Sequence, residues 1–427
     1  MRPFSGSSSI VFSGTSAESA DVCVSMRIAF ADTVMLRHLD CNDAYFTAHG
    51  GGGHPSDLIG VALAVGEAVG ASGYDVLRSI VLGYEVNGAL ASGVWLRQRG
   101  WDQGLNIVAA AAMMAGDLLH LDHDQLHNAL ALAVTPHVPV RQTRIGHLSM
   151  WKGCATAGAV RNGVFSALLA SRGMTGPPEP YTGRSGIWEL VTGEFELTLP
   201  LRADRAIVED TSIKMRPAEF NAQAAIDLAS DLHGQFAIDD VSDIEIATYW
   251  LAWHEIGMDE AKWDPHNRET ADHSLPYLVA VALVDGDVDS DSCGPQRLAD
   301  PALRPLLKRI RVVERPEYTE RFPAEFNVQI TVTLHDGSTL VRHAAVPHGH
   351  PRDPASDAEV DAKFDNMVAG RRAAERETCV QVRQLARGVA EAKDLSALAE
   401  LLRGLRPSGA GRSGAGPSGD GASGGAL

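Results

Sequence analysis

The chain has 427 residues, and its 54 acidic residues outnumber the 37 Lys and Arg residues, which gives a formal net charge of −17. At about 150 residues per domain, this length predicts two or three domains. Because 45% of the residues are apolar, disorder is excluded for most of the chain. The acidic balance, without a basic cluster, argues against nucleic acid and anionic membranes as partners.

The five cysteines are far apart in the sequence, and none forms a C-x-x-C pair. This usage argues against a disulfide framework and a thiolate zinc site, and it favours a reducing compartment. The N-terminus lacks the apolar core of a signal peptide, and no run reaches the ~18–20 apolar residues that span a bilayer. We therefore expect a cytoplasmic protein.

Residues 56–172 are rich in Ala, Leu and Val at helical spacing, in segments separated by glycines. Some segments are apolar on nearly every side, which is typical of helices inside a large domain or between subunits and favours an oligomer. The predicted helices span residues 58–69, 74–92, 107–119, 124–134 and 152–171.

A different pattern follows the Gly/Pro-rich stretch 173–186. Apolar and polar residues alternate over 326–334, Asp336-Gly337 predicts a turn, and a second strand follows over 338–345. Residues 244–250 also alternate, whereas 219–232 and 274–283 have helical spacing. We therefore expect a mostly α fold with an α+β second domain.

The domain boundaries that we predict follow these changes of pattern. The last twenty residues include eight glycines, so we expect a disordered Gly/Ser tail. The predicted parts are a helical domain over 1–200, an α+β domain over 201–350, a helical return segment over 351–405 and the tail over 406–427.

The first candidate site lies around a cluster of four glycines, 50–53, between Asp40 and His54. A carboxylate and an imidazole on a loop that glycines leave free to approach a ligand suit acid/base chemistry. The structural alternative is that Ser56 or Asp57 caps the next helix and that Asp40 pairs with Arg37.

Further candidates lie in a basic stretch and at a helix start. Asp102 opens a predicted helix, where a cap is the simplest explanation of an acid. Arg141, Arg144, His147 and Lys152 form a basic stretch in an acidic chain, which suits a carboxylate substrate, with a solvated face as the alternative.

Two more blocks concentrate polar side chains. Lys214 lies in Lys-Met-Arg-Pro at the start of the second domain. Arg268, His273 and Tyr277 lie within ten residues of one another before a helix, which is a high density for a connection. In contrast, H-E-x-x-H, a phosphate-binding loop and a dinucleotide fingerprint are all missing from the sequence, so we expect no metal and no cofactor.

These blocks, in this order, resemble the MmgE/PrpD family and, within it, the 2-methylcitrate dehydratase branch. The resemblance implies a large all-helical domain built from both chain ends, an inserted smaller α+β lid domain and a homodimer. It also implies chemistry on small di- or tricarboxylates without a cofactor. The matching motifs are Arg37-His-Leu-Asp-Cys-Asn-Asp, His54-Pro-Ser-Asp, Gly83-Tyr-Glu, Gly100-Trp-Asp, Ser149-Met-Trp-Lys-Gly, Gly173-Met-Thr-Gly-Pro, Lys214-x-x-Pro, Lys262-Trp-Asp-Pro, Arg268 to Tyr277, Gly349-His-Pro and Lys363-Phe364.

The resemblance also implies a pocket in a cleft between the two domains. It assigns Asp40, His54, Lys214 and Tyr277 to this pocket and matches Lys152 to a family lysine. At Asp102 the decarboxylase relatives carry His, so the aspartate favours the dehydratase branch. The sequence departs from the branch at Cys41 and Ala44, and only 39 residues, with a Ser/Gly-rich start not expected to be helical, precede Asp40.

Dehydration of a hydroxy tricarboxylate needs a base, an acid and cations that hold the growing charge on a carboxylate. We expect His54 or Asp40 to transfer one proton, Tyr277 to transfer the other, and Lys214 with Arg268 to clamp carboxylates. Asp102 completes the expected catalytic set, and Arg144, Lys152 and His273 complete the expected substrate-binding set. The expected activity is a hydro-lyase that converts 2-methylcitrate, or a similar acid, to 2-methyl-cis-aconitate. The alternatives are a decarboxylase or epimerase on a related acid and an inactive paralogue.

Overall fold

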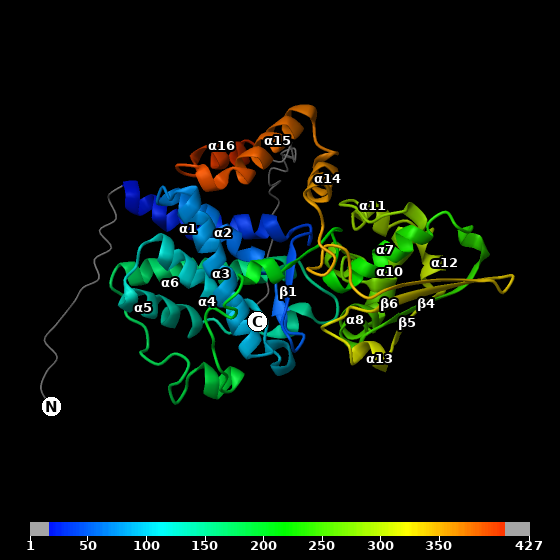
Figure 1. The fold of residues 1–427 in the computed structure, drawn as a ribbon, viewed down its shortest axis with the longest axis horizontal. Coiled ribbons are helices and arrows are strands. Elements are labelled where there is room, and N and C mark those ends of the chain that lie inside the picture. The colour runs from blue at the N-terminus through cyan, green and yellow to red at the C-terminus, as the bar shows by residue number, and fades with distance from the viewer. Residues whose placement is uncertain (1–16, 406–427) are drawn as a thin grey trace, which may run out of the picture.

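The computed structural model describes residues 17–405, which form a mostly helical protein with 55% helix and 10% strand (Figure 1). This confirms the prediction of a mostly α fold with small sheets. The chain start at 1–16 and the expected tail at 406–427 lie outside the described residues. Within 17–405, no helix combines the length and the hydropathy needed to cross a membrane.

Six long helices build the first hydrophobic core, with α4 packed between its neighbours α3, α5 and α6 (Figure 1). Five of them confirm the helices predicted from apolar spacing. Their bounds are α1 (Ala17–Arg37), α2 (Ile59–Ala68), α3 (Gly73–Gly93), α4 (Gly104–Leu118), α5 (His123–Val134) and α6 (Trp151–Ser171).

Helix α1 was not among the predicted helices. Its most buried side chains recur at every fourth position, Ser25, Ala29, Thr33 and Arg37, and this face packs against α2 and α6. Three of these four residues are polar, so the buried face carries no apolar periodicity. A tertiary contact, rather than a hydropathy pattern, therefore explains this helix.

The close contact of α4 with α6 depends on Gly163. A Cβ atom at this position would lie 2.6 Å from Ala111 Cβ and 2.8 Å from Val108 O. We expect Gly163→Ala to lower the free energy of unfolding by roughly 1–3 kcal/mol through overpacking, measured by urea denaturation. Gly153→Ala in the same helix is the control, because its Cβ meets nothing within 4 Å. Equal stability of the two variants would contradict this packing.

The second core packs against a four-stranded sheet of order β5-β4-β6-β7 (Figure 1). Strand β4 is parallel to β5 and antiparallel to β6, and Ile246 faces Ile330 across the β4–β6 pair. The strands confirm the predicted alternation and add β5, which was not predicted. Their bounds are β4 (Val241–Thr248), β5 (Ile310–Glu314), β6 (Val328–Leu334) and β7 (Thr339–Ala344).

Helices α7 and α10, which the sequence predicted, fill the second core together with α12. Tyr277 of α10 is fully buried there. The helices of this part are α7 (Gln223–Leu232), α8 (Trp250–Ala252), α9 (Arg268–Ala271), α10 (Leu275–Asp285), α11 (Pro295–Leu298), α12 (Leu303–Leu307) and α13 (Pro316–Thr319).

The C-terminal segment is helical, as its spacing predicted, and part of it packs against the first core. Leu395 is buried among the side chains of that core, and Lys363 Nζ donates a hydrogen bond to Cys41 O at 2.8 Å. Figure 1 shows α15 and α16 next to α1 and α2, with α14 nearer to α11. Their bounds are α14 (Asp357–Val368), α15 (Ala373–Arg387) and α16 (Ser396–Gly404).

A small sheet of order β2-β1-β3 lies where the two cores meet. It consists of β1 (Asp43–Phe46), β2 (Gly52–Gly53) and β3 (Ser212–Ile213). Phe46 of β1 packs against Phe220 and Phe326, with ring centroids 5.0 Å apart in each pair. This aromatic cluster fixes the loop that carries Asp40 and His54, and Ala44 packs within it.

Candidate active site

Asp40 follows α1 in a left-handed conformation, with φ +49°, and its side chain is buried. Its carboxylate lies 3.1 Å from Lys214 Nζ, 3.6 Å from Lys152 Nζ and 3.4 Å from Arg37 Nη2. Burial alone would raise the pKa of Asp40, but the neighbouring cations Lys152, Lys214 and Arg37 hold it well below its ordinary value. Asp40 is therefore the ionised centre of a buried charge network, and the expected Arg37 pair is part of it.

The same network reaches His273 through Lys152. His273 Nδ1 lies 2.6 Å from Asp272 Oδ1 and 3.2 Å from Lys152 Nζ, and Lys152 Nζ lies 3.5 Å from Asp272. Burial and the Lys152 charge lower the pKa of His273 to about 4, so its imidazole is neutral at neutral pH. Asp40, Asp272 and His273 are close enough to share a metal ion, but here the Lys152 ammonium lies among them.

His54 is oriented by the backbone of β1. Its Nδ1 lies 2.6 Å from the carbonyl oxygen of Asp43, which can only accept, so Nδ1 carries the proton and Nε2 is the basic nitrogen. Burial and the charges of Arg37 and Lys214 lower the pKa of His54, which keeps the imidazole neutral. The geometry therefore provides a neutral base.

The Asp43 side chain fixes this loop. It accepts hydrogen bonds from Ser56 Oγ at 2.5 Å and from Tyr84 Oη at 2.9 Å. Ser56 and Asp57 lie inside the short helix η1 (Pro55–Leu58), whose N-cap is His54, and the N-cap of α2 is Leu58, so the capping alternative is wrong. Asp57 is instead buried, 3.5 Å from Arg37 Nε.

Asp102 both caps a helix and orients an arginine. Its Oδ1 accepts from the backbone N–H of Gly104 at 3.0 Å, where α4 begins, and its Oδ2 lies 2.5 Å from Arg144 Nε. Burial raises the pKa of Asp102, but Arg144 outweighs this and lowers it. Asp102 itself does not line the pocket described next, but it contacts Arg144, which does.

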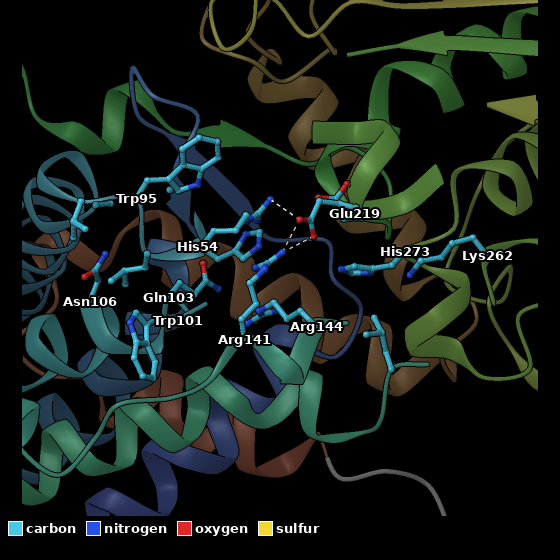
Figure 2. Close-up of a pocket in the computed structure, with 17 residues that line it drawn as sticks. His54, Trp95, Trp101, Gln103, Asn106, Arg141, Arg144, Glu219, Lys262 and His273 are labelled. Carbon is cyan, nitrogen blue, oxygen red and sulfur yellow. Dashed lines mark hydrogen bonds and ion pairs between the residues drawn. The ribbon is translucent and has the colours of Figure 1, made fainter. Parts of the chain in front are cut away.

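A pocket of ≈ 780 Å³, including space open to solvent, is lined by residues from two parts of the chain, 52–148 and 219–273. Figure 2 shows His54 at its centre, with Arg141 and Arg144 below it and His273 and Lys262 facing it from the other side. The cations that line this pocket are Arg97 of η2 (Leu96–Arg99), Arg141 and Arg144 of η3 (Arg141–Arg144) and Lys262 of η9 (Glu260–Trp263).

Two glutamates also line the pocket, and the sequence interpretation missed both as site residues. Glu255 of η8 (Trp253–Gly257) lies 2.5 Å from Arg141 Nη2. Burial raises the pKa of Glu219 to about 7, although Lys214 and the 2.6 Å hydrogen bond from the Asn221 N–H lower it. A carboxyl group with this pKa is partly protonated at neutral pH and can donate a proton.

Several predicted residues do not line the pocket. Asp40, Lys152 and Lys214 lie in the buried charge network that contacts His273. Tyr277 donates its hydroxyl hydrogen bond to Ser292 O at 2.8 Å, inside the second core. Arg268 donates to Ser290 O at 3.2 Å and also lies outside the pocket lining.

The site residues that the sequence interpretation missed differ in the signal that the sequence carries for them. Lys262 stands in one of the family motifs, so the motif could have marked it. Glu219 follows Pro217 where a helical pattern begins and accepts a hydrogen bond from Asn221 at the start of η6 (Phe220–Ala222), as an ordinary cap does. Only burial in the folded protein distinguishes Glu219 from such a cap.

Comparisons with known proteins agree with these features. The MmgE/PrpD N-terminal domain matches residues 16–200, and the MmgE/PrpD C-terminal domain matches residues 217–386.

The 2-methylcitrate dehydratase of Cupriavidus necator is 31% identical over 356 residues, which cover 77% of this chain and 71% of that protein. The mitochondrial 2-methylcitrate dehydratase of Yarrowia lipolytica is 28% identical, with 78% of this chain and 67% of that protein covered. The enzyme of that name from Escherichia coli K12 is 27% identical, with 77% and 71% covered. The residues that form the pocket fall within these matched regions, and the chain belongs to the MmgE/PrpD family.

Proposed function

We propose that the protein is a hydro-lyase that dehydrates 2-methylcitrate, or a similar hydroxy tricarboxylate, to 2-methyl-cis-aconitate. The observation that carries this proposal is one pocket that combines four cations, a neutral imidazole and a carboxyl group whose pKa is about 7. The relatives named 2-methylcitrate dehydratase support the choice of substrate.

The cations suit the three carboxylates of such a substrate. Arginine binds a carboxylate with two parallel hydrogen bonds, which fixes its orientation as well as its charge. In the proposed complex Arg97, Arg141 and Arg144 hold carboxylates from the helical side, and Lys262 holds one from the other side. These contacts also stabilise the charge that develops when the neighbouring proton leaves.

The proposed reaction needs two proton transfers. His54 Nε2 takes the proton from the carbon next to a carboxylate, and the electron pair of this C–H bond forms the double bond. The C–O bond to the hydroxyl breaks at the same time, and Glu219 donates a proton to the departing oxygen, which leaves as water. In this proposal the Asp40, Lys152 and Lys214 network positions His273, whereas Tyr277 and Arg268 support the second core.

The proposed role of Glu219 predicts how activity depends on pH. Glu219 donates only while protonated, and its pKa is raised to about 7. We therefore expect kcat/KM to fall as pH rises through about 7, and Glu219→Gln to remove this limb together with roughly 10²-fold or more of kcat/KM. Initial rates over a pH series measure both effects, with the exposed Glu196→Gln as control. An unchanged limb in Glu219→Gln would contradict the assignment.

The proposed role of Arg144 predicts a binding defect when its partner is changed. Asp102→Asn keeps a hydrogen-bond acceptor for the Gly104 N–H but removes the charge that orients Arg144. We expect KM to rise about tenfold with a smaller change in kcat, because oriented substrate binding is lost. Steady-state kinetics check this, with the exposed Asp124→Asn as control. The same KM in both variants would argue against a substrate contact by Arg144.

We further propose that residues 201–350 form a lid over a helical domain made of 1–200 and 351–405, and that the protein acts as a cytoplasmic homodimer. The two separate cores and the pocket between them support the lid. Light scattering tests the dimer. Small-angle scattering with and without a tricarboxylate tests whether the proposed lid closes over the helical domain.

The substrate assignment is tested by incubating the purified protein with 2-methylcitrate, citrate and cis-aconitate. We expect the ultraviolet absorbance of a new conjugated double bond with 2-methylcitrate, and a product lighter by one water. Carbon dioxide release from cis-aconitate would instead assign a decarboxylase, and a rearranged acid of unchanged mass an epimerase. A folded protein that converts none of them would overturn the proposal in favour of an inactive paralogue.

A further inference from the structure

Glu255 contacts the same arginines that the proposed function assigns to substrate carboxylates. Arg141 Nη2 lies 2.6 Å from Glu255 Oε1 and 2.5 Å from Oε2, and Arg97 Nη1 lies 3.5 Å from Oε1. The glutamate belongs to η8 in the second part of the chain, whereas the arginines belong to η2 and η3 in the first. This ion pair therefore joins the two sides of the pocket.

Glu255 offers the arginines the same chemical group as the substrate would. Burial raises the pKa of Glu255, but Arg97 and Arg141 outweigh burial and lower the pKa to about 2, so the side chain is a carboxylate at neutral pH. Because both its oxygens approach the one Nη2 atom of Arg141, a substrate carboxylate cannot use this atom in the same way while Glu255 holds it.

The balance of charge in the pocket leads to the same conclusion. Of the four lining cations, Arg144 is paired with Asp102, and Arg97 and Arg141 share Glu255. With Glu219 protonated, as the proposed reaction requires, two positive charges therefore remain uncompensated in the pocket lining, whereas a tricarboxylate carries three negative charges. Withdrawal of Glu255 from the arginines raises the number of uncompensated cations to three.

We propose that Glu255 is an internal carboxylate competitor, which holds Arg97 and Arg141 until a carboxylate of the substrate takes its place. This inference rests on the proposed assignment of the pocket to a tricarboxylate. Glu255 lowers the affinity for every such ligand. Its displacement also breaks an ion pair between the two sides of the pocket, which couples binding to their relative movement.

Binding of propane-1,2,3-tricarboxylate tests this proposal without turnover, because this acid has no hydroxyl group to lose. We expect Glu255→Gln to bind it about tenfold more tightly than wild type in titration calorimetry, since a charged competing contact is removed. Glu245→Gln is a matched control and should bind like wild type. Glu245 is as exposed as Glu255, at 14% of its side chain, and also pairs with two arginines, but it lies on β4 outside the pocket lining.

Glu255→Asp is a second variant that keeps the negative charge, in case folding depends on it. Its side chain is shorter by one methylene, which moves the carboxylate away from the arginines. It should show a smaller gain in affinity than Glu255→Gln. Unchanged or weaker binding by both variants, while wild type binds, would overturn the competitor role and leave the proposed reaction intact. If Glu255→Gln bound the tricarboxylate more tightly but wild type did not dehydrate 2-methylcitrate, the competitor role of Glu255 would stand and the proposed reaction would be rejected. A wild type and variants that all fail to bind would overturn both.

Discussion

Replacing His54 with glutamine is expected to lower kcat for 2-methylcitrate dehydration by roughly 10²- to 10⁴-fold, the usual contribution of a general base. The glutamine side chain has no basic nitrogen to replace Nε2, which is the free nitrogen of a ring whose Nδ1 is held by the carbonyl oxygen of Asp43. KM should change much less, because the cations that bind carboxylates remain. Steady-state kinetics with the conjugated product as readout measure both parameters.

The matched control for this variant is His123→Gln, because the His123 side chain is 97% exposed on α5. It should retain wild-type kinetics. Thermal unfolding of both variants separates a chemical effect from a folding effect. A folded His54→Gln protein with wild-type kcat would show that His54 is not the base.

Asp40→Asn is expected to give the largest loss of stability among these variants, roughly 3–5 kcal/mol at neutral pH. Its carboxylate is the counter-ion of Lys214, Lys152 and Arg37, and removing one partner of a buried charge network leaves the others uncompensated. Asparagine tolerates the left-handed conformation at this position, so the loss reports the charge rather than the backbone.

The stability difference should depend on pH in a defined direction. The pKa of Asp40 is lower in the folded protein than in the unfolded chain, so its stabilising effect is fully present above the unfolded value and is lost as pH falls through the folded one. Urea denaturation at neutral and acidic pH measures this. Asp204→Asn, which breaks an exposed pair with Arg202, should change stability by less than about 1 kcal/mol. A neutral-pH stability of Asp40→Asn equal to wild type would contradict the buried network.

The sequence predicted the parts of the fold in which burial and hydropathy coincide. Helices α2 to α6 and strands β6 and β7 carry apolar residues at the period of their own structure, and all of them were found. Helix α1 was not predicted because its buried face contains Thr33 and Arg37, which contact Asp57 and Asp40 in the folded protein.

For the site, the sequence marked some residues that line the pocket and others that lie outside its lining. His54, Arg144 and His273 line the pocket. Tyr277 was expected to face the substrate, but α10 is apolar on nearly every side and buries the tyrosine within the second core. Glu219 has an unremarkable local sequence, and its raised pKa arises from burial between distant segments, which one sequence does not show.

The proposed dehydration is tested most directly by comparing the masses of the products that wild type and His54→Gln form from 2-methylcitrate under identical conditions. We expect wild type to accumulate an acid lighter by one water, with the conjugated absorbance of 2-methyl-cis-aconitate, and the folded variant to form little of it. If wild type formed no such acid, or if both proteins formed it equally fast, the assignment of this pocket to a dehydration would be contradicted.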